Sequence, residues 1–238
     1  MKTILFTTLS FIFLISCAQE TVKGNGKTTS EIRKVSSNFD AVESAGAFDV
    51  MIKDGAQDGN IKLEGESNIL EKIEVKLNGS TLVLKQKPGF NFRSTKNVAI
   101  TFNAKNLRSI GLSGSGNITT EGVQKVDSFN AGLSGSGDLD LKVSAKNVTA
   151  GISGSGNIKL NGNTDNLEIG ISGSGDVSAF GLKANDVQVG VSGSGDIEVT
   201  SNGNLKAAVA GSGDIYYKGN PQSVNAKSSG SGDVVDAN

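Results

Sequence analysis

Apolar and polar positions alternate in short runs along most of this chain. Between residues 39 and 102 these runs are broken by Gly, Asn and Asp. Alternation with a period of two is typical of strands that bury one face. The pair Asn78-Gly79 lies between two such runs and predicts a tight hairpin turn, because both residues tolerate positive φ. The pattern predicts an all-β protein with no helical element, since residues 68–73 could form one turn but are too few to stand as a helix.

The second half of the chain is built from repeats. A five-residue motif, Ser-Gly-Ser-Gly followed by Asp or Asn, recurs at spacings of 18 to 21 residues, each copy between two alternating apolar runs. Self-similarity near 20 residues is typical of stacked coils in which each coil contacts only its neighbours. The seven copies begin at Ser113, Ser134, Ser153, Ser172, Ser192, Ala210 and Ser229, and in the sixth Ala replaces the first Ser.

This spacing predicts a parallel β-helix, or β-solenoid, with coils of about 18–21 residues and an expected right-handed sense. Two strands per coil would stack into parallel sheets around a narrow continuous core. Hexapeptide solenoids need multiples of six residues, and leucine-rich repeats need a helical segment that this pattern lacks. The run from Val42 to Val50 also aligns with Ile152 to Leu160. We therefore expect one solenoid domain over residues 37–238.

The repeated motif is expected to form the sharp corner of each coil. Glycine provides φ values that are closed to other residues and lets backbones approach closely. The last residue of the motif is expected to accept the backbone N–H two residues further on and so to stabilise its own turn. The alternative is cation binding, although calcium needs six to eight oxygens and each coil offers one Asp. This turn ladder contains Asn117, Asp138, Asn157, Asp176, Asp196, Asp214 and Asp233.

The first residues have the pattern of an exported lipoprotein. An apolar run reaches Leu14-Ile15-Ser16-Cys17 and is too short to cross a bilayer. We expect residues 1–16 to be a signal peptide and Cys17 to carry lipid that anchors the protein in the membrane. Residues 17–36 are polar and predict a flexible tether. Ala18 favours the outer membrane, with the domain either exposed at the surface or facing the periplasm.

The composition excludes several kinds of chemistry. The chain has no His, and its only Cys is Cys17, which excludes Cys/His zinc sites, Ser-His-Asp triads and thiol nucleophiles. A net charge of −1 with scattered Lys and Arg gives no basic surface for nucleic acid. An enzyme would need paired carboxylates, and Asp138 and Asp140 show no sign of the buried pair that glycoside cleavage requires. We predict neither catalysis nor a cofactor.

Two aromatic pairs are weak candidates for ligand contact, because aromatic rings can stack on sugars. Within each pair we expect one ring to enter the core and the other to shield an exposed end. The candidates are Phe90, Phe92, Tyr216 and Tyr217.

The chain resembles the DUF2807 family of bacterial lipoproteins, described as auto-transporter adhesins with a head GIN domain. The resemblance rests on Leu14 to Cys17, the opening from Phe39 to Val50, the segment from Val75 to Leu84 and the motif copies. It implies a noncatalytic β-helical protein of the cell envelope, an adhesin that presents a repetitive surface to a glycan, matrix or protein partner. A periplasm-facing structural or sensory lipoprotein is the alternative, and a β-helical enzyme acting on polysaccharide is the third reading.

Overall fold

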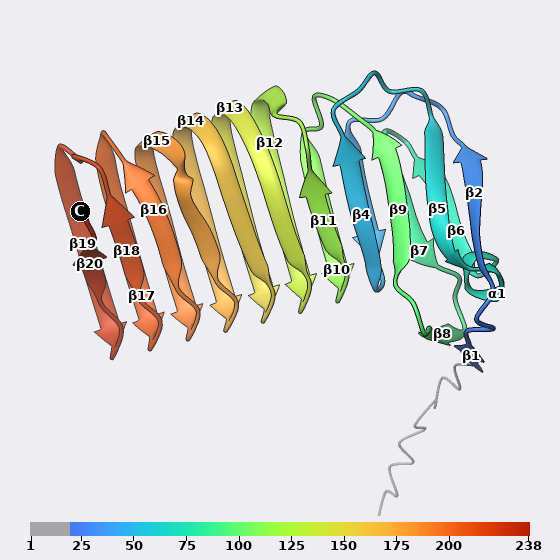
Figure 1. The fold of residues 1–238 in the computed structure, drawn as a ribbon. Coiled ribbons are helices and arrows are strands. Elements are labelled where there is room, and N and C mark those ends of the chain that lie inside the picture. The colour runs from blue at the N-terminus through green and yellow to red at the C-terminus, as the bar shows by residue number, and fades with distance from the viewer. Residues whose placement is uncertain (1–19) are drawn as a thin grey trace, which may run out of the picture.

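The computed structural model describes residues 20–238, which form an elongated β-solenoid with an N-terminal cap (Figure 1). The fold is the predicted parallel β-helix, and its helix α1 (Ser67–Leu70) is a single turn. The predicted signal peptide and Cys17 lie outside the described residues. Within the described part of the chain, no helix has the length and apolar character needed to span a membrane.

The coils have two sides, which meet at the Ser-Gly-Ser-Gly corner. The entry side holds the strand segments that lead into each corner, and the exit side holds the segments that leave it (Figure 1). Strands β13 to β15 run along both sides and bend between them. The entry side consists of β3 (Ala41–Ala45), β10 (Ser109–Gly114), β12 (Gln124–Gly135), the later parts of β13 (Asp138–Gly154), β14 (Asn157–Gly173) and β15 (Val177–Gly193), and then β17 (Asn204–Gly211) and β19 (Ser223–Gly230).

The exit side follows the same order along the solenoid axis. Between the coils, all strand pairings are parallel on both sides, and within residues 20–238 antiparallel pairing occurs only in the N-terminal cap. It consists of β4 (Phe48–Lys53), β11 (Asn117–Thr120), the first parts of β13, β14 and β15, and then β16 (Ile197–Ser201), β18 (Ile215–Lys218) and β20 (Val234–Asp236).

The core is a set of apolar columns that run between the two sides. Leu133, Ile152, Ile171 and Val191 pair in register, one per coil, and each is at most 3% exposed. Buried and exposed residues alternate along each strand. Ile169, for example, is buried, and its neighbour Glu168 is exposed. The alternation that predicted the strands therefore separates the core from the surface.

The N-terminal cap closes one end of the solenoid with antiparallel strands. On the exit side, β4 pairs with β9 (Val98–Asn103), β9 with β5 (Asn60–Glu66) and β5 with β2 (Thr28–Lys34), the last two pairings being antiparallel. On the entry side, β3 pairs with β7 (Thr81–Gln86). Strands β7 and β6 (Ile73–Asn78) form the predicted hairpin, with φ of 58° at Gly79. Strands β1 (Glu20–Lys23) and β8 (Phe90–Arg93) form a separate parallel pair.

The predicted tether is wrong for residues 20–23 and 28–34, which form β1 and β2 instead. These strands lack an apolar alternation because they lie at sheet edges, where Ile32 is 62% exposed. Polar contacts hold β2 in place: Arg33 donates to the backbone carbonyls of Leu70 and Ile73 at 2.6 and 2.5 Å.

Residues 41–53 form the first coil, as expected, but the predicted register is wrong by two residues. Ser44, not Val42, occupies the column of Leu112 and Ile152, and Val50 occupies the column of Ile158. The cause is a degenerate corner, Ala45-Gly46-Ala47-Phe48-Asp49, which pairs with the motif beginning at Ser113.

Candidate functional site

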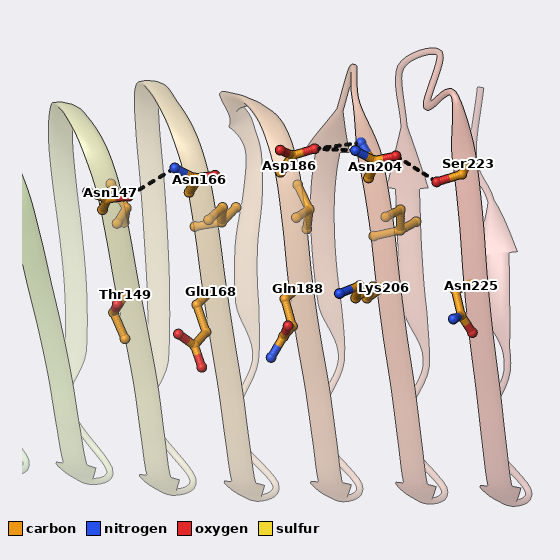
Figure 2. Close-up of a pocket in the computed structure, with 14 residues that line it drawn as sticks. Asn147, Thr149, Asn166, Glu168, Asp186, Gln188, Asn204, Lys206, Ser223 and Asn225 are labelled. Carbon is orange, nitrogen blue, oxygen red and sulfur yellow. Dashed lines mark hydrogen bonds between the residues drawn. The ribbon is translucent and has the colours of Figure 1, made fainter.

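The outer surface of the entry side carries rows of polar side chains that repeat once per coil. We call this surface the polar face, and it has two polar rows (Figure 2). The bend row, nearest the bend in the coils, contains Asn147, Asn166, Asp186, Asn204 and Ser223. The central row, two residues further along each strand, contains Thr149, Glu168, Gln188, Lys206 and Asn225. Both rows are exposed, and they line a shallow hollow of about 500 Å³.

Side chains in the bend row bond mostly to one another. Asn166 Nδ2 donates to Asn147 Oδ1 at 3.0 Å. Asp186 Oδ1 accepts the backbone and side-chain N–H groups of Asn204 at 3.0 and 2.8 Å, and Ser223 Oγ donates to Asn204 Oδ1 at 2.7 Å. The bend row therefore stabilises the stacking of the coils (Figure 2).

The central row is different, because its five side chains make no hydrogen bond or ion pair with any other part of residues 20–238. A hydroxyl, a carboxylate, two amides and an ammonium group thus face solvent in a line across five coils. Their spacing is set by the hydrogen-bonded strands beneath them, about 4.8 Å per coil. Such an array offers donors and acceptors to a ligand that lies along the solenoid axis.

Two further rows continue the entry-side surface toward the corner. The glycine row contains Gly111, Gly132, Gly151, Gly170 and Gly190, and the serine row contains Ser113, Ser134, Ser153, Ser172 and Ser192. Neither the polar rows nor the glycine row was predicted from the sequence. A sequence signal existed for the glycines, because Gly lies two residues before the first Ser in five consecutive motifs.

The turn-ladder residues lie at one corner of the solenoid, one per coil, but their bonding differs from the prediction. The backbone N–H of Asp196 donates to Asp176 Oδ1 at 2.8 Å, and that of Asp214 to Asp196 Oδ1 at 2.7 Å. The acceptor thus serves the next coil and not its own turn. The N–H of the next residue also bonds across coils, as Ile197 N–H does when it donates to the Asp214 carbonyl at 2.9 Å.

The remaining ladder bonds follow the same rule. Asp233 N–H donates to Asp214 Oδ1 at 2.8 Å, and Asn157 N–H donates to Asp138 Oδ1 at 3.1 Å. Across residues 20–238, no three His, Cys, Asp or Glu side chains cluster in a way that could hold a metal ion.

Asp138 and Asp140 both face outward on the exit side. Asp138 Oδ1 accepts Asn157 Nδ2 at 2.9 Å, and Asp140 lies 4.0 Å from Lys159 Nζ. Asp138 is exposed and Asp140 is partly exposed. The two carboxylates therefore form no buried acid–base pair of the kind that glycoside cleavage uses.

The four aromatic candidates lie at opposite ends of the molecule, with Phe90 and Phe92 on β8 and Tyr216 and Tyr217 on β18 (Figure 1). Phe92 packs against the core, and Phe90 lies beneath Lys72, whose Nζ is 4.5 Å from the ring centroid. Tyr217 also packs against the core, and burial raises the pKa of its hydroxyl. The structure does not bring the two pairs into one site.

Tyr216 extends the turn ladder rather than the polar face. Its hydroxyl donates to Asp214 Oδ2 at 3.0 Å, and this hydrogen bond raises the pKa of Tyr216 above its ordinary value.

Solved structures with the same fold come from Bacteroides and Parabacteroides species. A "putative adhesin" from Bacteroides fragilis is 25% identical, with a TM-score of 0.84 and coverage of 90% of this chain and 98% of that chain. A "putative adhesin" from Parabacteroides merdae is also 25% identical, with a TM-score of 0.65 and coverage of 91% and 100%. A "putative lipid binding protein" from Parabacteroides distasonis, 23% identical with a TM-score of 0.75 and coverage of 91% and 100%, shares the fold.

A search of curated proteins found no match. A family model does match, over residues 38–221, which include the first coil, most of the cap and all but the last of the motif corners. This chain therefore belongs to the DUF2807 family, described as "Putative auto-transporter adhesin, head GIN domain".

Proposed function

We propose that this protein is a noncatalytic adhesin, held at the cell envelope by lipid on Cys17, that contacts a glycan, matrix or protein partner through its polar face. The observation that carries this proposal is the central row. Its side chains are exposed, aligned across five coils and unbonded within residues 20–238. Membership of an adhesin family supports the same reading.

The scaffold suits repeated weak contacts. Each central-row residue sits on a strand that is hydrogen-bonded to a neighbour on both sides, except at the last coil. Little conformational freedom is therefore lost in the backbone when a ligand binds. Several equivalent contacts along one ligand would also raise the overall affinity without any single strong site.

The membrane attachment is the second part of the proposal, and it is supported by the sequence Leu14-Ile15-Ser16-Cys17. Replacing Cys17 with Ser should release the protein from the membrane fraction, because the thiol is the only site for a thioether-linked lipid. If Cys17→Ser still fractionates wholly with membranes, the lipid anchor is wrong.

The adhesive role is tested on intact cells that express the protein at native level. We expect external protease to remove the domain, and we expect cells carrying Cys17→Ser to adhere less to mucin-coated and matrix-coated surfaces. Protection from protease until the outer membrane is permeabilised would instead favour the periplasm-facing structural or sensory role. Release of reducing ends from a polysaccharide by the purified protein would favour the third reading, an enzyme.

A further inference from the structure

The glycine row lies in extended backbone with free space above it. A Cβ atom added at Gly132, Gly151 or Gly170 would meet no heavy atom within 4 Å, and none of these residues has a positive φ. At the corner glycines a Cβ would instead clash with the carbonyl oxygen of the preceding coil, as at Gly175. The fold thus requires Gly at the corners, whereas in the glycine row neither φ nor space demands it.

The missing side chains leave a trough along the solenoid axis. The central row forms one wall beside Gly151, Gly170 and Gly190, and Ser109 and Asn130 continue that wall beside Gly111 and Gly132. In the next two coils Ala208 and Lys227 take the place of the glycine. The serine row forms the other wall, four residues further along each strand, or about 13 Å. Hollows of about 390, 620 and 680 Å³ follow this trough, and the first of them shares Glu168, Gln188, Lys206 and Asn225 with the hollow between the two polar rows. Glycine inside strands often marks a place where a ligand or another backbone approaches closely.

Most of the polar side chains around the trough are uncharged. Five charged side chains line these hollows, three acidic and two basic, so no strong field of one sign is present. The remaining polar lining consists of amides and hydroxyls, which can both donate to and accept from a hydroxyl group. The charged residues are Glu43, Glu168, Asp186, Lys206 and Lys227.

The spacing of the rows distinguishes a sugar polymer from a peptide. The coils repeat about every 4.8 Å, whereas an extended peptide advances about 3.3 Å per residue and exposes alternate side chains on one face, out of phase with the rows. A six-membered sugar ring that is linked through opposite carbons advances by nearly one coil per unit. Each unit of such a polymer could therefore meet the same set of groups.

We infer that the trough binds an extended, uncharged polysaccharide, which lies on the glycine row and is hydrogen-bonded by the central row and the serine row. This inference rests on the proposed function, because it assigns a ligand class to the polar face.

The test is affinity electrophoresis of the purified full chain in native gels. The gels contain hydroxyethyl cellulose, galactomannan or yeast mannan as neutral polymers, polygalacturonate as an anionic polymer, or gelatin as a protein. We expect at least one neutral polymer to retard the wild-type protein and polygalacturonate to have no effect.

Two variants test the trough itself. Gly170→Phe fills it and should weaken retardation by about tenfold or more, and Gln188→Ala, which shortens an exposed side chain, should weaken it severalfold. Lys159→Phe is the matched control, because it adds the same ring to an outward position of β14 on the exit side and should bind as wild type does. Equal melting temperatures would show that all three variants are folded.

The inference is overturned if none of the three neutral polymers retards the wild-type chain, if polygalacturonate alone does so, or if Gly170→Phe binds as tightly as wild type. Retardation by gelatin alone, lost in Gly170→Phe, would overturn the polysaccharide but leave the polar face as an adhesive surface. If the cells also adhere without this protein, the proposed function fails as well.

Discussion

Asn117 Nδ2 donates to Asp49 Oδ1 at 2.8 Å, although 68 residues separate the two in the chain. Asp49 also accepts Asn97 Nδ2 at 2.8 Å through its other oxygen. The chain leaves the solenoid after the first coil, builds the rest of the cap, and returns in register at Ser109, which pairs with Ala41, so that Asn117 comes to lie beside Asp49. The turn ladder therefore begins at Asp49 and joins the cap to the regular coils.

The ladder depends on an acceptor oxygen and not on charge, because Asn117 and Asn157 occupy the same place as the aspartates. Replacing Asp196 with Ala removes the acceptor for the Asp214 backbone N–H and should destabilise the fold by about 1–2 kcal/mol. Asp196→Asn keeps an oxygen there and should cost less than about 0.5 kcal/mol. Urea unfolding of the two variants measures the difference.

The same reasoning predicts that calcium is not needed. Removal of divalent ions with a chelator should leave the melting temperature of the wild-type chain unchanged. A rise of several degrees in millimolar calcium would show that the ladder carboxylates bind metal, since a ligand of the folded state stabilises it.

Two glycines in one coil should respond oppositely to the same substitution. A Cβ at Gly175 would clash with the Gly156 carbonyl oxygen, so Gly175→Ala should cost about 2–4 kcal/mol or prevent folding. Gly170 has free space and ordinary φ, so Gly170→Ala should be neutral or stabilise the fold by about 0.4–1 kcal/mol.

Thermal unfolding of both alanine variants beside the wild type would decide this prediction. If Gly170→Ala lowers the melting temperature as much as Gly175→Ala does, packing also requires Gly in the glycine row. The space above that row would then not be open to a ligand.

The regular coils were predictable because one physical constraint recurs in each of them. The sharp corner requires Gly, and the inward positions require apolar side chains, so the period is visible in residues such as Gly154 and Ile171. The cap was less predictable, because β1 and β2 lie at edges where no alternation is imposed. The register of the first coil was missed because Phe48 replaces the second corner Gly.

The candidate site could not be predicted from the apolar pattern. Outward positions of a strand are free to vary, and the sequence does not show that Asn166 bonds within its row whereas Gln188 does not. That difference depends on side-chain geometry between neighbouring coils.

Glu66 should make the cap sensitive to acid. The carboxylate is fully buried at the end of β5 and accepts hydrogen bonds from Ser94 Oγ at 2.7 Å, Thr95 N–H at 2.9 Å and Gly26 N–H at 2.6 Å. These bonds, that of Ser94 foremost, lower the pKa of Glu66 from 4.5 to about 2. Since the folded pKa is lowered, the stabilisation is complete above about pH 4.5 and is lost as the pH falls toward 2.

Glu66→Gln should therefore melt at a lower temperature than the wild type at pH 7, and the gap should narrow between pH 4.5 and pH 2.5. The control is Glu64→Gln, on the same strand, which removes only a partly exposed ion pair with Lys62. Its melting temperature should follow that of the wild type at every pH. If the difference in melting temperature between the wild type and Glu66→Gln stays constant from pH 4.5 to pH 2.5, the lowered pKa of Glu66 does not stabilise the cap.

The stacking of the coils predicts where the fold tolerates charge. Ile169 is 2% exposed between Ala150 and Val189 of the adjacent coils, so Ile169→Asp would bury a carboxylate without a partner. The cost should be several kcal/mol, comparable with the stability of a whole domain. The neighbouring Glu168 faces solvent, so Glu168→Lys should change stability by less than about 0.5 kcal/mol. Aspartate substitutions along residues 106–235, followed by denaturant unfolding, should show this sensitivity recurring every 18 to 21 residues. Sensitive positions that fail to repeat at this spacing would contradict the stacked coils, and with them the aligned rows on which adhesion through the polar face depends.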